Sequence, residues 1–547
     1  MLKIKSIFMS LLVLGALASC SNDNEIIQEG GDERDYGVAY MSIGVSTPKT
    51  VGTRASGEVN ATEAETIINE LFLIMFDENN QVVKDEDAPN AYISLTGGAL
   101  NSTGTAPKEP FKVSPSTKYL LVIANPGAIL KPALTSRVVV GATYASINAA
   151  ITLTATGADD NTYLVDEITN TVKGYTMINT GVYDATTKWN NGLYDVTGAV
   201  VAVTDGKTEA DVKAEAMNKK VTLSIERLAS KMEVTLASPV VLNPTVGQFV
   251  FKNWTVDYVN SKFFPFATKT LTASGHAAGG FYPSNFYTED PNFDNGNYSD
   301  GIVKNVVTAS NITNLKWYDL TDNNKIAYCI ENTMDDTEQR FGAATRLVLK
   351  AQYGPWADTD SDFKLDEGWF QSYYGGNYTN YKNLTELVAA YSAAVAKATK
   401  TDAETALIAD CDNFLGILKT TYTSNTFPAT FADLDQTTHL TPIATENGGQ
   451  ITKDNNISGL LWYQKSINYY YYEIRHDNAA DTYMEYGKYG VVRNNYYTLK
   501  LTRVNGNGTP WYPEVDEPDE EIDKKGAYLY FDVSIAPWIS WQTDFEI

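Results

Sequence analysis

The chain has 547 residues, of which 43% are hydrophobic and 20% are charged. This length exceeds what a single hydrophobic core supports, so we expect two domains and additional segments in a globular protein. Lys and Arg total 42 against 67 Asp and Glu, which gives a net charge of −25 at pH 7. A charge of this sign repels nucleic-acid phosphates and anionic lipid heads, so we expect no nucleic-acid partner. The 35 tyrosines are typical of a β-rich chain.

The first twenty residues, MLKIKSIFMSLLVLGALASC, have the pattern of a secretory signal. Lys3 and Lys5 precede an apolar stretch at residues 7–18 that is too short to anchor in a bilayer. Residues 17–20, LASC, resemble the lipobox of bacterial lipoproteins, where the signal is cut before the cysteine and the sulfur is acylated. The resemblance predicts a lipid, such as palmitate, on Cys20. The alternative is an ordinary signal with a chance cysteine.

A single short strand follows an acidic, polar tether. Its apolar residues alternate with small or polar ones, the period-two pattern of a strand with one buried face. The four residues on the predicted buried face are Ala39, Met41, Ile43 and Val45.

Residues 49–57 are small and polar, and we expect a flexible loop there. A trypsin-like protease needs an Arg or Lys in such a loop, and Arg54 followed by Ala55 meets this requirement. The alternative is an exposed loop arginine with no role.

Short alternating strands separated by turn residues fill most of the remaining chain, as in ELFLIMFDENNQVV and KYLLVIANPG. This pattern predicts antiparallel β-sandwiches. Pro239 and Pro244 interrupt it, and we place a domain boundary near Ser238.

Residues 384–421 differ from this pattern because they are rich in Ala and Leu at helical spacing. Thr401 and Glu404 have the spacing of a capping box. We predict a helical insertion in the second domain, with one apolar face lined by Leu407, Cys411, Phe414 and Leu418.

The chain closes with another alternating strand, within residues 527–547. Its apolar face is Leu529, Phe531, Val533 and Ile535. Chain ends normally fray, so large apolar groups there raise the question of what they are buried against. Whether the strand packs in its own chain is open.

Few residues carry the pattern of a chemical site. Asp358, Asp360 and Asp362 alternate as in a calcium loop, but Phe363 and Trp369 stand where Gly and a bidentate Glu belong. An acidic hairpin tip is the favoured interpretation. No clustered Cys or His ligands predict a metal, and no cofactor is expected. Tyr469–Tyr472 could stack on sugars, although strand packing is favoured.

The leader has one of the three cysteines, which leaves Cys329 and Cys411. Two separate buried thiols are favoured over a disulfide between them. No serine, phosphate-loop or Cys–His motif supports catalysis, so we expect no enzyme.

Six segments, taken in order with the leader and the tail, resemble the fimbrilin superfamily of Bacteroidetes type V pili, and most of all its minor-fimbria shaft subunit. These segments are LFLIMFDENNQV, YLLVIANPG, IERLASKMEV, YCIENT, YGVVRNNYYTLKLTRVNGNGTPWYP and VSIAPW. The resemblance covers nearly the whole chain, except for the Ala-rich insertion at 384–421.

The resemblance implies an all-β fold of two tandem transthyretin-like β-sandwiches, at 55–238 and 239–547, after a signal peptide at 1–20. It also implies export as a lipoprotein to the outer membrane and cleavage after Arg54 by a trypsin-like, Arg-specific protease. Loss of residues 21–54 would remove the strand from Ala39 to Val45 and open a groove. The donor strand of another copy, within 527–547, would fill that groove and build an extracellular, head-to-tail fimbria.

The expected partners are further copies of the chain, accessory or anchor fimbrilins, the protease, and a host or bacterial surface ligand. The expected function is a structural pilin that supports adhesion and biofilm formation. Two alternatives stay open: a surface glycan-binding lipoprotein, and a tip or accessory fimbrilin.

Overall fold

The computed structural model describes residues 38–46, 59–153, 168–170, 173–179, 192–267, 287–293, 302–304, 315–446, 459–477, 482–524 and 529–539. Three predicted features lie outside these residues: Cys20, the Arg54–Ala55 cleavage site, and the last eight residues of the chain. Contacts group Gly37–Ile547 into one unit.

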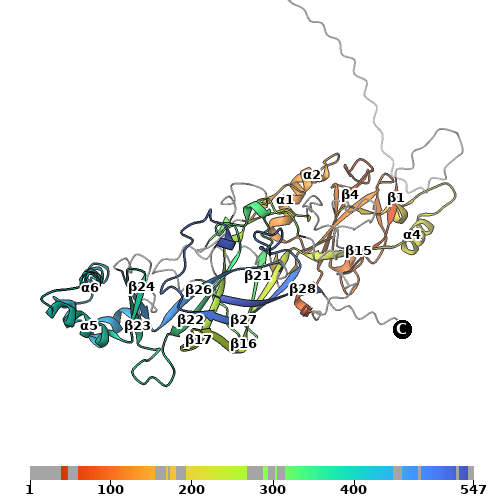
Figure 1. Ribbon diagram of the computed structural model, residues 1–547. Helices are drawn as coiled ribbons and strands as arrows, with labels where there is room; N and C mark the ends of the chain where they lie inside the picture. The colour runs from red at the N-terminus through yellow and green to blue at the C-terminus, as the bar shows by residue number, and fades with distance from the viewer. Residues whose placement is uncertain are drawn as a thin grey trace, which may run out of the picture. The chain divides into compact units, whose positions relative to one another are not determined.

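Two sheets form the first part of the described chain (Figure 1). The larger sheet has the order β2 (Ile43–Ser46), β15 (Val221–Arg227), β12 (Met177–Asn179), β8 (Tyr119–Ala124), β4 (Glu70–Phe76) and β5 (Val82–Val83). Two further strands pair with it, β13 (Tyr194–Asp195) on β8 and β6 (Tyr92–Thr96) on β4. The smaller sheet has the order β14 (Val201–Ala202), β1 (Ala39–Met41) and β7 (Phe111–Val113).

The larger sheet is buried on both faces, which explains why β4 is apolar without alternation. Leu71, Leu73 and Met75 point into a cluster shared with the smaller sheet. Phe72 and its neighbours on the other face join a second cluster, which includes Leu134 of the helix α1 (Gly127–Arg137) and Ile147 of α2 (Tyr144–Ile147). A strand enclosed in this way has no polar face to present to water.

The second part pairs a five-stranded sheet with a three-stranded one. The first has the order β21 (Ile326–Ile330), β16 (Ala229–Asn243), β27 (Asn495–Asn505), β28 (Leu529–Ile539) and β3 (Val59–Asn60). The second has the order β17 (Gln248–Asp257), β22 (Arg346–Gly354) and β26 (Ile467–Glu473). Met232, Trp254, Leu349 and Leu499 lie in the cluster that also contains Phe72, so one apolar core continues between the two parts.

The strand β16 runs through the boundary that we placed near Ser238. Its pairing with β27 shifts register between Leu236 and Val241, around Pro239. Proline is tolerated in a strand where the ladder is irregular, so it interrupts the sequence pattern without ending the strand. The chain changes sheets earlier, at Leu228, between β15 and β16.

A third sheet has the order β24 (Asn377–Tyr381), β23 (Gly368–Tyr374) and β25 (Leu460–Gln464). Between β24 and β25 the chain forms α5 (Leu384–Ala396), α6 (Asp402–Thr421) and α7 (Thr441–Glu446). Thr401 and Glu404 form the capping box that their spacing predicts, with Glu404 N–H to Thr401 Oγ1 at 3.2 Å. Cys411, Phe414 and Leu418 are buried beneath α6 against the sheet.

The remaining elements are short. They are η1 (Glu63–Glu65), η2 (Gly97–Ala99), η3 (Thr197–Ala199), α4 (Glu209–Asn218), η7 (Asp336–Glu338), η8 (Phe431–Asp433), η9 (Gln436–Leu440), η11 (Ile522–Lys524), and the strand pairs β9 (Ile151–Thr152) with β19 (Lys262–Phe263), β10 (Thr169–Asn170) with β11 (Gly174–Tyr175) and β18 (Val259–Asn260) with β20 (Ile302–Val303). The described chain is therefore mostly β-sheet with few helices, as the sequence predicts. None of its described helices combines the length and hydropathy needed to cross a membrane.

Candidate functional site

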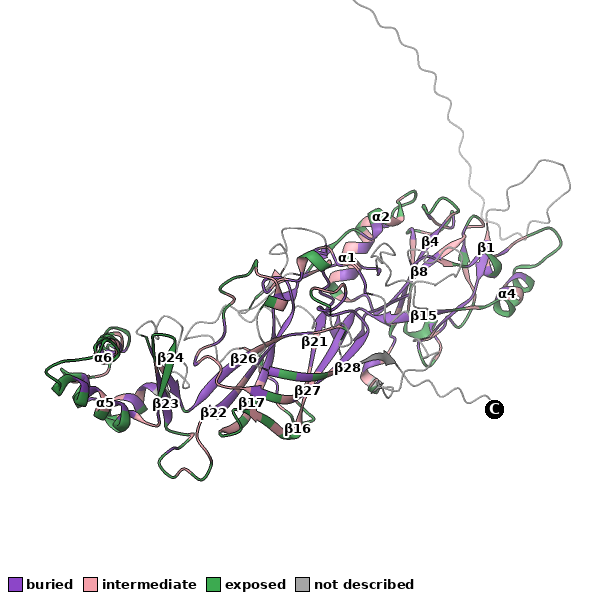
Figure 2. Ribbon diagram, in the orientation of Figure 1, coloured by how far each residue is buried: buried purple, intermediate pink, exposed green. Residues whose placement is uncertain are grey.

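The segment that contains the consecutive strands β1 and β2 is deeply enclosed. Its four predicted inward-facing residues are all 3% exposed or less: Ala39, Met41, Ile43 and Val45. Tyr40 and Ser42, which point the other way, are buried as well. Figure 2 shows the strand β1 in the colour of buried residues. The segment is therefore buried on both faces, whereas its sequence pattern predicts only one buried face.

Backbone pairing holds β1 on both edges. Ala39 lies opposite Val113 of β7 on one side and opposite Ala202 of β14 on the other, both antiparallel. β2 runs parallel to β15, with Ile43 opposite Val221. Removal of β1 would leave β7 and β14 with unpaired edges, the condition under which a sheet accepts a new strand.

The floor beneath this segment is an apolar cluster built by four strands of the larger sheet and their neighbours. Its buried members include Leu71, Leu73, Met75, Leu120, Val122, Met177, Leu223 and Ile225. Burial of Met41, Ile43 and Val45 against this floor contributes roughly 5–9 kcal/mol, from about 1.5–3 kcal/mol for each side chain. We call the space occupied by Ala39–Ser46 the N-terminal slot.

The helix α4 covers the outer face of the slot. Tyr40 packs against Val212 and Ala216, and Lys213 Nζ lies 5.2 Å from the centre of its ring. Burial and a hydrogen bond with the Glu209 carboxylate raise the pKa of Tyr40 to about 12. The slot thus has a specific pocket for a tyrosine on its outer side, which we did not predict from the sequence. The capping pair Thr208 and Asp211 marks where α4 begins and was the available signal.

Ser42 and Gly44 also face outward in the slot. Ser42 Oγ lies 3.3 Å from Met217 Sδ at the end of α4. A Cβ atom at Gly44 would lie 2.8 Å from Lys220 Cε, the flexible end of a side chain. A small residue can therefore replace Gly44 if Lys220 moves.

The C-terminal strand β28 lies in the chain's own five-stranded sheet. Leu499 of β27 is opposite Val533, and Leu501 is opposite Phe531, in antiparallel register. Leu529 and Phe531 are buried, and the Phe531 ring centre is 4.7 Å from that of Tyr472. Val533 is half-buried, and the side chain of the fourth predicted residue, Ile535, lies outside the described part. The strand therefore packs in its own chain, the point that the sequence left open.

On its second edge, Trp538 and Ile539 of β28 pair in parallel with Val59 and Asn60 of β3. β28 therefore lies between β27 and β3 in the five-stranded sheet.

Glu65 fixes the segment that follows the predicted cleavage site. Its carboxylate accepts a hydrogen bond from Lys231 Nζ at 2.9 Å and from Tyr328 Oη at 2.8 Å. Its backbone oxygen accepts from Arg227 Nε at 3.0 Å. Burial alone would raise the pKa of Glu65, but the Lys231 ammonium and these hydrogen bonds hold it below its ordinary value. Residues from Glu65 onward are therefore tied to β15, β16 and β21 independently of the slot.

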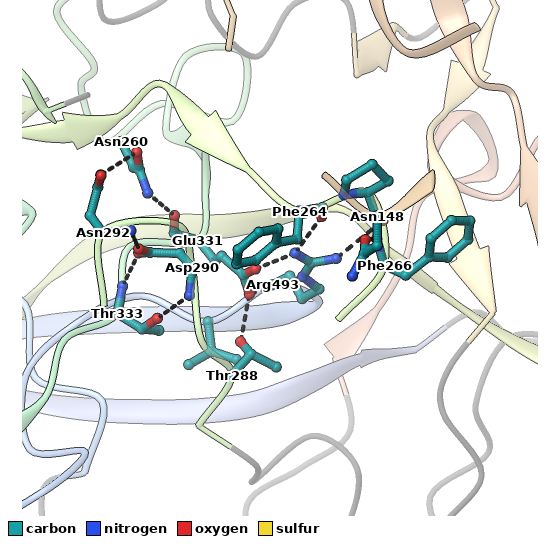
Figure 3. Close-up of polar contacts among 12 residues, drawn as sticks. Asn148, Asn260, Phe264, Phe266, Thr288, Asp290, Asn292, Glu331, Thr333 and Arg493 are labelled. Carbon is teal, nitrogen blue, oxygen red and sulfur yellow. Dashed lines mark hydrogen bonds and ion pairs between the residues drawn. The ribbon is translucent and has the colours of Figure 1, made fainter. Parts of the chain in front are cut away.

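A second buried polar network lies around Arg493 (Figure 3). Its Nε donates to Glu331 Oε2 at 2.9 Å, and the two side chains form an ion pair in which each is 1% exposed. Arg493 also donates to the Phe264 backbone oxygen at 3.0 Å, while Asn148 Oδ1 accepts from the N–H of Phe266 at 2.7 Å. These bonds join Asn148, at the end of α2, to the loop after β19, and join that loop to Arg493 ahead of β27.

Asp290 is fully enclosed in the same network. Burial raises its pKa to about 8, although the backbone N–H groups of Asn292 and Thr333 each donate to it at 2.6 Å. Asn292 Nδ2 continues the network to Asn260 Oδ1 at 3.0 Å. Each of these groups is bonded to the backbone or to a neighbouring side chain, so the network holds loops in place.

The acidic triplet does not converge. The Asp360 carboxylate lies 2.9 Å from Lys382 Nζ and accepts from the N–H of Asp362. Within the described ranges, no group of three or more His, Cys, Asp or Glu side chains is arranged to hold a metal ion.

Two other predicted sites are packing residues. Cys329 and Cys411 are both buried, unpaired thiols in different apolar clusters, as favoured from the sequence. Tyr469 and Tyr470 of β26 are buried and cannot stack on an external sugar.

Two family models match this chain. Major fimbrial subunit protein (FimA) matches residues 39–227, and the C-terminal model of fimbrillin, major fimbrial subunit protein type IV, matches residues 462–544. The first match begins at the first residue of β1 and ends at the last residue of β15, so it contains the whole slot. A search of curated proteins gave no match.

Several solved structures are distantly similar. A protein from Bacteroides eggerthii described as a cell adhesion protein is 13% identical, with 93% of this chain and 99% of that chain covered and a TM-score of 0.37. The tip fimbrial protein Mfa3 from Porphyromonas gingivalis is 10% identical, with 92% and 100% covered and a TM-score of 0.32. A fimbrial assembly protein from Parabacteroides distasonis is 13% identical, with 57% and 81% covered and a TM-score of 0.27.

The first family model includes the enclosed strand β1, and the second includes the C-terminal strand β28. These two matches, to families of major fimbrial subunits, support the assignment of this chain to the fimbrilin superfamily.

Proposed function

We propose that this fimbrilin is a structural shaft subunit that polymerises when proteolysis empties the N-terminal slot and the C-terminal strand of another copy fills it. Export as a lipoprotein through Cys20 and cleavage between Arg54 and Ala55 precede assembly. The proposed partners are further copies, accessory or anchor fimbrilins and an Arg-specific protease. The role is structural and supports adhesion, without catalysis.

One observation carries this proposal: the segment in the slot and the C-terminal strand match position by position. Residues 39–45 read AYMSIGV, and residues 529–535 read LYFDVSI. Both segments have apolar residues at the first, third, fifth and seventh positions, a tyrosine at the second, a polar residue at the fourth and a small one at the sixth. A one-residue slip would turn every apolar side chain to the wrong face, so the match also defines the register.

In this register Tyr530 would take the place of Tyr40. Tyr40 fills the pocket beside α4, whereas Tyr530 is 42% exposed in its own chain, with the Arg503 guanidinium 5.3 Å from its ring centre. Transfer would bury the Tyr530 ring next to Lys213 and Glu209. Asp532 would follow at the place of Ser42, and Ser534 at the place of Gly44, where its side chain requires Lys220 to move.

The C-terminal strand can occupy its own sheet or an empty slot, and assembly depends on the difference in free energy between these two places. In its own sheet β28 pairs with β27 from Leu529 to Pro537 and with β3 at Trp538 and Ile539, while β1 pairs with β7 and β14. Leu529 and Phe531 are buried in either place, but an empty slot exposes an apolar floor that is otherwise buried. Filling it regains roughly 5–9 kcal/mol, less the cost of repacking around the larger donor side chains.

Strand addition of this kind derives affinity from main-chain bonds and specificity from alternate side chains. The donor strand and the slot are different surfaces of one chain, so the contact is head to tail. Such a contact does not close on itself and extends into a filament.

A disulfide between β27 and β28 tests the exchange. Lys500 and Asp532 are exposed and lie directly opposite each other in the two strands, at a separation suited to a disulfide. The purified Lys500→Cys/Asp532→Cys chain, cut with trypsin, should stay monomeric when oxidised and polymerise when reduced, as read from gel ladders and electron microscopy.

The matched control is a disulfide between two strands that take no part in the strand exchange. Ser372 and Thr379 are opposite each other in the β23–β24 hairpin, and Ser372→Cys/Thr379→Cys should polymerise equally well in both redox states. If the oxidised Lys500→Cys/Asp532→Cys chain polymerised as fast as the reduced one, β28 would not be the strand that is exchanged.

A further inference from the structure

The β23–β24 hairpin carries a group of exposed tyrosines. Tyr373, Tyr374 and Tyr378 are each between 45% and 63% exposed. The other two strongly exposed tyrosines among the described residues are engaged: Tyr483 donates to Glu521 at 2.6 Å, and Tyr530 lies against Arg503. Several large aromatic side chains exposed to solvent on one hairpin indicate a binding surface.

Two of these tyrosines share a face of the hairpin with one exposed amide, that of Asn380. Tyr373 and Tyr378 are directly opposite each other, with ring centres 4.8 Å apart. One pair further along the same face, Gln371 lies opposite Asn380, and its Nε2 donates to Asn380 Oδ1 at 2.8 Å. The bond leaves the exposed Asn380 amide N–H₂ group available beside the rings. Gln371 itself is only 3% exposed and supports Asn380 from below, so we call Tyr373, Tyr378 and Asn380 the hairpin patch.

The hairpin is held rigidly from behind. Gly375 and Gly376 have φ values of 57° and 86°, the left-handed conformation that a two-residue hairpin turn requires. On the opposite face, Phe370 stacks on Trp462 and contacts Phe414 of α6 in a buried cluster. The core thus fixes the hairpin patch before any ligand arrives, which lowers the entropy cost of binding.

The hairpin patch is uncharged in a strongly acidic chain. Residues from Gly368 to Tyr381 include no Asp, Glu, Lys or Arg, while the chain as a whole has a net charge of −25. A basic or acidic partner would find no complementary charge here. Tyrosine, asparagine, serine and glycine together offer rigid aromatic surface and adaptable hydrogen bonds.

We propose that the hairpin patch binds a neutral glycan, with the C–H face of a pyranose ring stacked on Tyr378 and Tyr373. The ring hydroxyls of the sugar would accept from the Asn380 amide and exchange hydrogen bonds with the tyrosine hydroxyls. A protein partner fits less well, because the two rings expose roughly 200–300 Å², against about 800 Å² per partner in a stable protein interface. This site does not depend on strand exchange, because β23 and β24 lie outside both the slot and β28.

Affinity electrophoresis of the full chain tests the site with four neutral polysaccharides as probes: laminarin, yeast mannan, dextran and galactomannan. At least one of them should retard the native chain. Tyr378→Ala should weaken that retardation at least about tenfold, equivalent to about 1.4 kcal/mol, and Tyr373→Ala/Tyr378→Ala should abolish it. Tyr378→Phe, which keeps the stacking surface, should stay within about threefold of the native chain.

Tyr483→Ala is the matched control, since it removes an equally exposed tyrosine elsewhere and should leave retardation unchanged. Three outcomes would overturn the site: no retardation by any of the four probes, equal retardation of the double variant, or loss of self-association as the only effect of Tyr378→Ala. The substituted tyrosines are exposed, so we expect all these variants to fold, and thermal denaturation of each variant checks this.

Discussion

Arg493 and Glu331 form an ion pair that no local sequence pattern predicts, because 162 residues separate them. Their pairing depends on the approach of β27 to the end of β21, which is a property of the fold. The pocket for Tyr40 is equally hidden, since Glu209 and Lys213 reach it only after α4 folds across the slot. At the residue scale, the sequence predicted which side chains are apolar and buried in strands, but not which polar groups meet.

Removal of one partner of this pair should be severely destabilising. Glu331→Gln leaves the Arg493 guanidinium buried without a counter-charge, so we expect a loss of about 3–5 kcal/mol in the free energy of unfolding. Glu367→Gln is the matched control, because its partner Lys364 is exposed, and should cost below about 1 kcal/mol. Urea denaturation of both variants measures the difference, and equal losses would contradict the account of the network.

His476 should make stability depend on pH. Burial lowers the pKa of His476 to about 4, and its Nδ1 lies 2.8 Å from the Tyr497 hydroxyl. Between pH 6.5 and 4 the unfolded chain therefore binds a proton that the folded chain does not, so stability falls as the pH falls through this window. The total loss from this residue is about 3 kcal/mol.

The measurement compares the native chain with His476→Gln by urea denaturation at pH 7 and pH 4.5. The variant cannot titrate at this position, so its stability should fall less with acid. An identical fall in both chains would show that His476 is not the group responsible.

At the scale of elements, periodicity predicted the inner face of the N-terminal strand, the faces of α6 and the strand character of residues 529–535. It did not predict that Tyr40 and Ser42 are also covered, because α4 covers them from a distant part of the sequence. The prolines near residue 239 predicted an ending that the strand β16 passes through at a register shift. The local sequence pattern thus predicts individual elements well, but it does not predict which elements pack against one another.

We predict that a mutation in the N-terminal strand changes the stability of the precursor but not that of the assembled filament. Ile43→Ala should destabilise the precursor by about 2–5 kcal/mol, because Ile43 is fully buried. The proposed cleavage after Arg54 would remove that residue, so assembled filaments of this variant should resist denaturant as native ones do.

Ile74→Ala is the control, since Ile74 of β4 is equally buried and stays in the mature chain. It should weaken precursor and filament alike. Filaments of Ile43→Ala that dissociated at lower denaturant than native filaments would contradict the replacement of the N-terminal strand.

For the whole molecule, one peptide bond controls assembly in this account. Arg54→Ala should leave unpolymerised precursor, because β1 and β2 then stay attached in the slot. Arg34→Ala, which changes an arginine on the other side of the removable strand, should still be cut and polymerise. N-terminal sequencing and heat-labile gel ladders measure both, and normal filaments from Arg54→Ala would contradict the role of the cut.

The central claim is that the slot holds its own strand before cleavage and the C-terminal strand of another copy afterwards. A cryo-electron microscopy map of the processed fimbria tests this most directly. We predict density for residues 529–535 of a neighbouring copy between β7 and β14, with the ring of Tyr530 against Val212 and Ala216. A slot that still held residues 39–45, or an empty slot with β28 still beside β27, would contradict the account.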